Sequence, residues 1–195
     1  MTRCYSVPVT NRQMSLALVA LPHLWLISDA RNDAMLETAL ARMPSGSALV
    51  YRHYHLAPVE RRARFRHLAR VARRFGHSVI LSGSARQARA WGADGAYGSS
   101  VVLAPGPRTV RIATVHGLRE LAEARRARAD AVMLSPVFPT RSHPGGRVLG
   151  PTRFRLIARA ARVPVIALGG MTQARARTLR VRRWAAIDGL SGESR

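Results

Sequence analysis

Two glycine-rich stretches near the end of the chain have the groups needed to bind a phosphate. Residues 168–171 read LGGM, and residues 188–192 read DGLSG. Glycine has no Cβ, so the backbone N–H groups beside it stay accessible to an anion, and a serine adds a hydroxyl donor. Glycines at these places could equally serve only to turn the chain. The candidate phosphate-binding residues are Gly169, Gly170, Gly189 and Ser191.

The first of these stretches ends a strand–loop–helix–strand unit. Residues 131–134 form an apolar run that is too short for a helix and stops at a Ser-Pro pair, which predicts a buried strand. Between residues 154 and 161 apolar side chains recur at i, i+3, i+4 and i+7, as on the buried face of a helix. Residues 163–168 are apolar on both sides of the pleat, which is typical of a parallel sheet covered by helices. The unit therefore indicates a parallel α/β protein.

The same alternation repeats along the whole chain. Strands are expected to begin near residues 23, 47, 78, 95, 111, 131, 164 and 184. Eight strand–helix steps predict an α/β protein of the (β/α)8 TIM-barrel type rather than an open sheet. The barrel should be short, because residues 99–108 look like loop, and it should have a truncated C-terminal end. We expect residues 1–20 to be an N-terminal extension and residues 21–195 to form a single TIM-barrel domain.

Local patterns predict how two of the helices are placed. Asn32 or Asp33 is expected to cap the first helix, since a short polar side chain there can accept a backbone hydrogen bond. A later helix should turn Leu118, Leu121 and Ala122 toward the core. In a TIM barrel the chemistry lies at the carboxyl ends of the strands, and phosphate commonly binds after the seventh and eighth. The two glycine-rich stretches occupy those places.

The charge of the chain points away from specific nucleic-acid binding. All 32 basic residues are arginine and none is lysine, giving a formal net charge of +22. This one-sided usage, beside abundant alanine, resembles a compositional bias of the source genome. Aromatic residues are few and do not alternate with the arginines, as a base-stacking surface would require. We expect nonspecific, salt-sensitive adhesion to polyanions and no specific nucleic-acid partner.

Composition also bounds the cellular setting. No apolar run approaches the 18 or so residues that span a membrane, and the apolar stretch near residues 14–21 has no convincing cleavage site. These features predict a cytoplasmic protein without a membrane partner. Cys4 is the only cysteine, which excludes an internal disulfide and a cysteine-based metal cluster. The composition is compatible with a homo-oligomer.

Three linked motifs in the last third of the chain carry a family resemblance. They are the Ser-Pro-Val-Phe-Pro-Thr loop at 135–140, Leu149-Gly150, and Val-Pro-Val-Ile-Ala-Leu-Gly-Gly at 163–170. Their order and spacing resemble the thiamine phosphate synthase and thiazole tautomerase family. The resemblance implies a transferase of thiamine biosynthesis that joins hydroxymethylpyrimidine diphosphate to thiazole phosphate and releases pyrophosphate with the help of Mg²⁺. It also implies that the glycine-rich loops hold the thiazole phosphate.

The resemblance extends to the groups that handle the diphosphate. Arg52 stands where the family has an arginine after strand two, and Thr114 replaces a serine that contacts the diphosphate. His116 keeps the histidine found in many members. Arg52, Thr114 and His116 are therefore the candidate catalytic residues. The candidate diphosphate-binding residues are Arg52, Thr114, Thr140, Arg141, Ser142 and His143, with Arg147 as a further source of positive charge.

The metal site of the family is not matched. Ser82-Gly83 stands where the family has Asn-Asp, and Val102 matches its second metal-binding aspartate. Mg²⁺ is therefore possible as a cofactor by resemblance while its expected ligands are absent, and no metal ligand is assigned. Asp29 or Asp94 would have to replace them.

Three functions follow from these residues. The first is a thiamine phosphate synthase with altered or weakened chemistry. The second is an isomerase like thiazole tautomerase, in which His116 transfers the proton, because histidine titrates near neutral pH. The third is a catalytically inactive relative that binds a small phosphorylated ligand.

Overall fold

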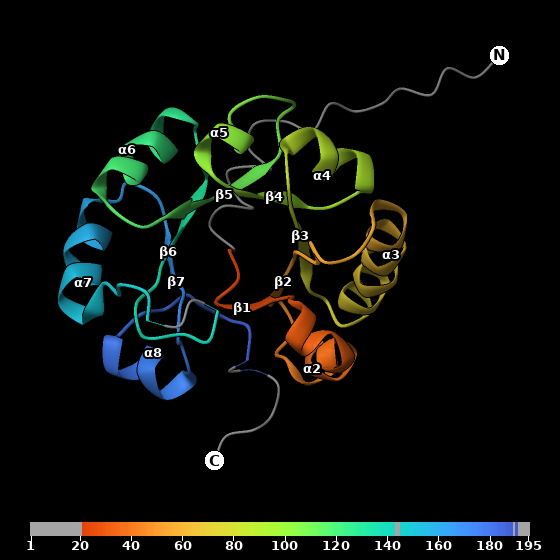
Figure 1. Cartoon of the computed structure of the whole chain (residues 1–195), viewed down its shortest axis with the longest axis horizontal. Helices are drawn as coiled ribbons and strands as arrows, with labels where there is room; N and C mark the ends of the chain where they lie inside the picture. The colour runs from red at the N-terminus through yellow and green to blue at the C-terminus, as the bar shows by residue number, and fades with distance from the viewer. Residues whose placement is uncertain (1–20, 143–144, 189, 191–195) are drawn as a thin grey trace.

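Eight parallel strands close into a barrel, which confirms the predicted (β/α)8 architecture (Figure 1). The computed structural model describes residues 21–142, 145–188 and 190, so the expected N-terminal extension lies outside the described residues. Each strand pairs with its sequence neighbour, and β1 pairs with β8 to close the ring. The strands are β1 Leu24–Ile27, β2 Ala48–Tyr51, β3 Ser78–Ser82, β4 Gly95–Gly98, β5 Val110–Val115, β6 Ala131–Leu134, β7 Val165–Ala167 and β8 Trp184–Ala186.

Helices surround the barrel and connect consecutive strands (Figure 1). They are the 3-10 helix η1 Ala30–Met35 and the helices α2 Leu36–Arg42, α3 Pro58–Arg74, α4 Ala85–Trp91, α5 Ser100–Leu103, α6 Leu118–Arg126, α7 Gly150–Ala160 and α8 Gln173–Leu179. The expectation of a loop between β4 and β5 was wrong, because α5 forms a single turn there. No helix follows β8 within the part of the chain that the structure describes, in line with the truncated end. None of the described helices is long and apolar enough to cross a lipid bilayer.

Alternation along each strand divides the core into two layers. Trp25, Ile27 and Met133 belong to a fully buried cluster inside the barrel. Leu26 and Leu134, one residue along their strands, belong to a second cluster that packs against the helices. Successive side chains of a strand point to opposite faces, which explains this division. On β6, β7 and β8 the helix-facing layer holds Val132, Leu134, Ala167 and Ala186, with Val165 packed against it.

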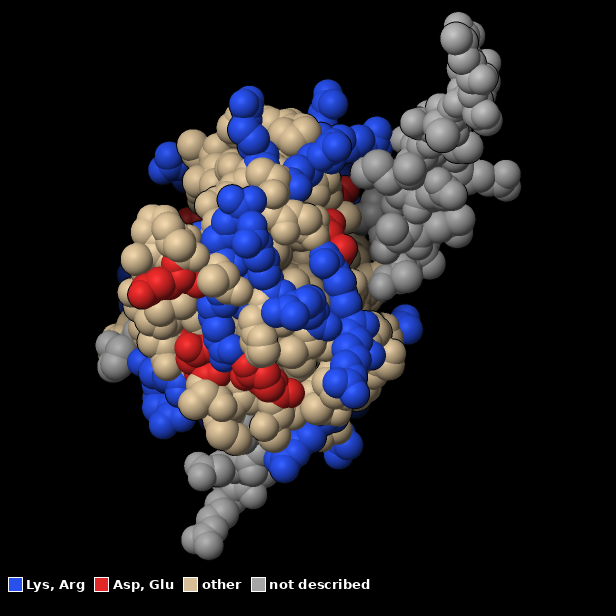
Figure 2. Space-filling view, turned by 90° about the vertical axis from the view of Figure 1, so that its right-hand side faces the viewer, with Lys and Arg blue, Asp and Glu red and all other residues tan. Residues whose placement is uncertain are grey.

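Several arginines of α3 lie on its solvated face, while Arg61 and Arg64 are partly buried and hydrogen-bonded. Arg62, Arg66 and Arg70 are exposed, whereas Phe65 and Leu68 on the opposite face are buried. Figure 2 shows this side of the molecule, where basic side chains are interspersed with acidic and uncharged ones. The view shows arginines spread over the surface rather than a single unbroken basic track.

Two local expectations were wrong. The N-cap of η1 is Asp29, whose carboxylate accepts from the Arg31 N–H at 3.3 Å, because the helix begins earlier than its apolar pattern. On α6, Leu118 is 61% exposed and Ala122 is also exposed, while Ala124 is buried. The third residue expected to face inward, Leu121, does pack against the helix-facing cluster. Leu118 is exposed because it is the first residue of the helix, next to the Gly117 cap.

Asn32 joins the first and last strands where the barrel closes. Its Nδ2 donates to the carbonyls of Ile27 at 3.0 Å and Ile187 at 2.9 Å, and its Oδ1 accepts from the Asp29 N–H at 2.8 Å. The side chain is only 4% exposed, so water cannot replace these bonds.

We therefore expect Asn32→Ala to lower the free energy of unfolding by about 2–4 kcal/mol, since it leaves buried carbonyls unpaired. Urea unfolding followed by circular dichroism measures the loss. Met35→Ala, in the same 3-10 helix but 43% exposed, is the matched control and should change stability little. Equal stability of the two variants would contradict this role of Asn32.

Candidate active site

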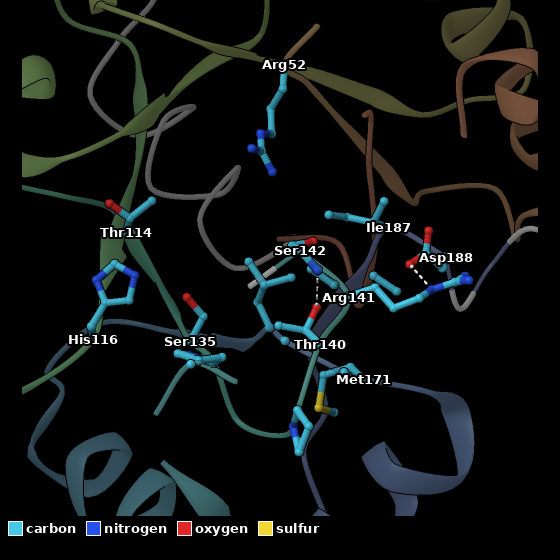
Figure 3. A pocket seen from close by; sticks show the side chains of 18 of the residues that line it. Arg52, Thr114, His116, Ser135, Thr140, Arg141, Ser142, Met171, Ile187 and Asp188 are labelled. Atoms are coloured by element: carbon cyan, nitrogen blue, oxygen red, sulfur yellow. Dashed lines mark hydrogen bonds and ion pairs between the residues drawn. The ribbon is translucent and has the colours of Figure 1, made fainter. Parts of the chain in front are cut away.

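A cavity of about 740 Å³ opens at the carboxyl ends of the strands. Its walls come from the loops that follow β2 to β8, so residues far apart in the sequence meet there. Figure 3 shows Arg52 reaching into it from one side, Thr114 and His116 on another, and Arg141 beside Asp188 at a third. This is the end of a TIM barrel at which active sites are found.

The cavity brings together the residues singled out in the sequence, as far as the structure describes them. Those that line it are Arg52, Thr114, His116, Thr140, Arg141, Ser142, Gly169 and Gly170, and Arg147 lines it too. The remaining candidates, His143, Gly189 and Ser191, lie outside the described residues. The expected meeting of both glycine-rich loops can therefore be followed only for Gly169 and Gly170.

Gly169 and Gly170 occupy positions that only glycine fits. Their φ angles are +95° and +59°, in the left-handed region. A Cβ on Gly169 would lie 2.6 Å from the Pro136 Cα, and one on Gly170 would lie 2.3 Å from the Pro139 carbonyl oxygen. The Val137 N–H donates to the Leu168 carbonyl at 2.9 Å, which holds the two loops together. The glycines thus turn the chain and allow close packing of the loops, while they also line the cavity.

The backbone of Arg52 is fixed on both sides. Its N–H donates to the Ser28 Oγ at 2.8 Å, and its carbonyl accepts from the Arg61 Nε at 2.7 Å. The guanidinium lies 5.5 Å from the centre of the Tyr54 ring, within range of a cation–π contact. A fixed backbone at the end of β2 therefore presents a planar cation to the cavity, which suits binding of a phosphate or diphosphate.

His116 lies at the end of β5 with Glu120 one helical turn away. The Glu120 carboxylate accepts from the His116 N–H at 2.6 Å and lies 2.8 Å from the imidazole Nδ1. A carboxylate at Nδ1 favours the tautomer with the proton there and leaves Nε2 as the acceptor. This arrangement could accept a proton from a bound ligand, although the pair is about half exposed to solvent.

An ionic network joins three loops at the edge of the cavity. The Asp188 carboxylate lies 3.4 Å from the Arg141 Nε and 3.4 Å from the Arg31 Nη1. Arg31 also donates from Nη2 to the Ser142 Oγ at 2.8 Å and pairs with Asp29 at 2.8 Å. Burial would raise the pKa of Asp29, but the hydrogen bonds and charge of Arg31 outweigh it and hold that pKa below its usual value. The loops after β1, β6 and β8 are therefore cross-linked by charge.

The ends of β3 and β4 do not offer a magnesium site. The Ser82 hydroxyl is hydrogen-bonded to the Tyr54 hydroxyl, and the Ser82 carbonyl accepts from the Arg61 Nη2 at 2.8 Å. Gly83 has no side chain and Val102 is apolar. Mg²⁺ requires hard oxygen ligands, mainly carboxylates. A guanidinium and a tyrosine instead occupy this corner, so the residues present do not fit the ion.

Neither Asp29 nor Asp94 can replace the missing metal-binding carboxylates. Asp94 precedes β4 at the opposite end of the barrel, where it accepts from the Val79 N–H at 2.7 Å. Asp29 is paired with Arg31 and is not part of the cavity wall. Among the described residues of the wall the one carboxylate is Asp188, which follows β8 and is engaged by arginines.

Several wall residues were not foreseen from the sequence. Tyr54 and Tyr97 form an aromatic side of the cavity, and burial raises the pKa of Tyr97 to about 12, so its phenol stays neutral. Arg175 hydrogen-bonds to the Gly170 carbonyl and lies 4.8 Å from the centre of the Phe138 ring. Only their place in the chain could have indicated them: Tyr97 is on β4, Tyr54 is in the loop after β2, and Arg175 is in the first turn of α8, the helix that follows β7.

Comparison with known proteins then assigns the chain. Residues 24–190 match the model of a family described as thiamine monophosphate synthase. The chain belongs to this family. The match includes every strand of the barrel and the whole described cavity, so the resemblance first seen in the last third of the sequence extends over the fold.

Individual relatives agree with the family. A thiamine-phosphate synthase from Pyrococcus furiosus is 35% identical over 71 residues, which are 36% of this chain and 34% of the relative. One from Chlorobium luteolum is 37% identical over 87 residues, which are 44% of this chain and 41% of the relative. The solved thiamine phosphate pyrophosphorylase from Pyrococcus furiosus is 26% identical, with a TM-score of 0.74 and 91% of each chain covered. The sequence matches thus span about a third to two fifths of those relatives, while the structural match spans nearly all.

Proposed function

We propose that this member of the thiamine monophosphate synthase family is a thiamine phosphate synthase. It would join hydroxymethylpyrimidine diphosphate to thiazole phosphate and release pyrophosphate. The observation that carries the proposal is the convergence of Arg52, Thr114 and the loop 140–142 on one cavity, opposite Gly169-Gly170. One side can receive a diphosphate and the other a monophosphate, which is the pair of anions that this reaction requires.

The cavity residues have distinct roles in this proposal. The bond between the pyrimidine methylene carbon and the diphosphate oxygen breaks, and the leaving pyrophosphate keeps the electron pair. The Arg52 guanidinium stabilises the negative charge that develops on the pyrophosphate, and the hydroxyls of Thr114 and Ser142 donate hydrogen bonds to it. The thiazole nitrogen, held by its phosphate at Gly169-Gly170, forms the new bond to that carbon. Each step uses groups of this chain.

The same geometry supports a weak dependence of the synthase activity on magnesium. Guanidinium groups stand in for metal charge in the cavity, and the ends of β3 and β4 lack a suitable oxygen set. We expect thiamine phosphate formation to be slow. EDTA should lower its rate by less than about tenfold, because a metal ion would contribute little to stabilising the transition state.

A fluorescence assay of thiamine phosphate, after oxidation to the thiochrome, measures this with and without Mg²⁺. A family member with the aspartates in place is the control and should lose nearly all activity in EDTA. A steep Mg²⁺ requirement in this protein would contradict the arginine-based site. Absence of product under both conditions would contradict the synthase proposal itself.

The wider setting belongs to the same proposal. We propose that residues 21–195 act as one domain in the cytoplasm on small phosphorylated substrates, without a nucleic-acid or membrane partner. The spread of basic and acidic side chains on the face seen in Figure 2 supports this choice of partner.

A further inference from the structure

A second cluster of metal-binding side chains lies outside the cavity. Asp33 belongs to η1, and His53 and His55 belong to the loop after β2. One ligand atom from each of the three side chains lies within 4.8 Å of the other two. None of the three belongs to the cavity wall, so the cluster is separate from the proposed catalytic groups.

His53 is the buried member of the cluster, and one of its ring nitrogens is hydrogen-bonded on the side away from the other two residues. Its side chain is fully buried, and its Nδ1 lies 2.8 Å from the Ser28 Oγ. An acceptor at Nδ1 fixes the ring of a metal-binding histidine and directs Nε2 to the ion, and the Ser28 hydroxyl oxygen can act as that acceptor here. The backbone at His53 has φ +44°, in the left-handed region. Such a conformation in a non-glycine residue is often found where function constrains the chain.

The other ring nitrogen of His53 faces the Asp33 carboxylate. Its Nε2 lies 2.8 Å from the Asp33 Oδ1, at ion-pair distance, but the approach is too bent for a well-aligned hydrogen bond. Buried polar atoms are nearly always hydrogen-bonded or bound to an ion. Two ligands of a tetrahedral ion, with bonds near 2.05 Å, are about 3.3 Å apart. The two atoms would therefore have to separate by about half an ångström to hold one cation between them.

The remaining groups allow a cation at this place. His55 is exposed, and its ring centre lies 5.0 Å from that of His53, so the side chain can complete the site. Arg64 pairs with Asp33 at 2.7 Å and also with Glu37. The two carboxylates together outweigh the one guanidinium, so the surroundings keep a net negative charge.

We propose that Asp33, His53 and His55 bind one zinc ion. Two imidazoles and one carboxylate suit Zn²⁺ and other transition metals, whereas Mg²⁺ prefers an all-oxygen set. The Ser28 hydroxyl that supports His53 also accepts from the Arg52 N–H, so the ion would stiffen the turn that presents Arg52 without touching substrate. The proposal does not depend on the synthase activity.

Calorimetric titration of the full-length, untagged, metal-free protein tests this site. ZnCl₂ should bind with one ion per chain, and MgCl₂ at the same concentrations should give no heat. His55→Ala should weaken zinc binding by at least about tenfold, the lower end of what even outer partners contribute. His67→Ala is the matched control, because His67 is also half exposed but pairs with Glu37 instead. It should bind zinc like the unaltered protein.

Several results would overturn the site. The first is no zinc binding. The second is unchanged affinity in His55→Ala, which would place the ion elsewhere, for instance at Cys4 or His143. The third is an equal loss in His67→Ala. Circular dichroism checks that each variant is folded. Asp33→Asn serves as a second ligand variant and should also weaken zinc at least about tenfold, whereas unchanged affinity would again refute the site. Since no substrate is present, failure here is distinct from failure of the synthase assay.

Discussion

Replacing Arg52 by alanine should lower kcat/KM for thiamine phosphate formation by about 10²–10³-fold, the usual effect of removing one group that stabilises developing charge. The guanidinium is the cation that β2 presents to the cavity, and no described carboxylate at β3 or β4 holds a metal that could compensate. Because its backbone is held by Ser28 and Arg61, the substitution should remove charge without moving the loop. The thiochrome assay at saturating thiazole phosphate measures the loss.

Controls at other residues decide what this loss means. Arg62→Ala removes an exposed arginine of α3 outside the cavity and should leave kcat/KM within about twofold, since nonspecific attraction of anions is weak at physiological salt. His116→Ala should cost less than Arg52→Ala. A thiazole tautomerase would show the reverse order on a thiazole carboxylate phosphate, with turnover abolished by His116→Ala and little changed by Arg52→Ala. A protein inert toward both substrates but able to bind thiazole phosphate would be an inactive relative.

The barrel could be predicted from the sequence because its signal repeats. Apolar strands such as residues 131–134, which are buried on both faces, alternate with helices that have one apolar face, and eight repeats allow few arrangements. The ends of individual helices were harder to predict. Asp29 caps η1 by a hydrogen bond that leaves no periodic pattern in the sequence, and α5 is a single turn of four residues, too short to show a helical period.

The cavity was predictable where residues stand in a fixed relation to strand ends. Arg52, Thr114 and Gly169 follow or end strands, so the closure of the barrel alone brings them together. The pairing of Tyr54 with Ser82 depends on which way each side chain turns, and the sequence holds no trace of that. The same is true of the contact between Asp33 and His53, which joins η1 to the loop after β2, 20 positions further along the chain.

Gly170→Asp should weaken binding of thiazole phosphate by at least about 100-fold, which corresponds to about 2.7 kcal/mol. Two effects act together. The new carboxylate would stand beside the phosphate and repel it. The Cβ would also lie 2.3 Å from the Pro139 carbonyl oxygen, at a φ of +59° that side chains rarely adopt, so the neighbouring loop must shift. Calorimetric titration with thiazole phosphate measures the change in Kd.

Two further variants separate charge from strain. Gly170→Ala carries the same backbone strain and close contact without charge, so it should weaken binding less than Gly170→Asp. Gly46→Asp adds the same charge at a similar left-handed φ of +81°, but in open space at the other end of the barrel, and should leave Kd unchanged. Unchanged affinity in Gly170→Asp would refute a phosphate site at this loop. An equal loss in the alanine and aspartate variants would assign the effect to packing of Gly170 against Pro139, and the loop would then serve the fold rather than the anion.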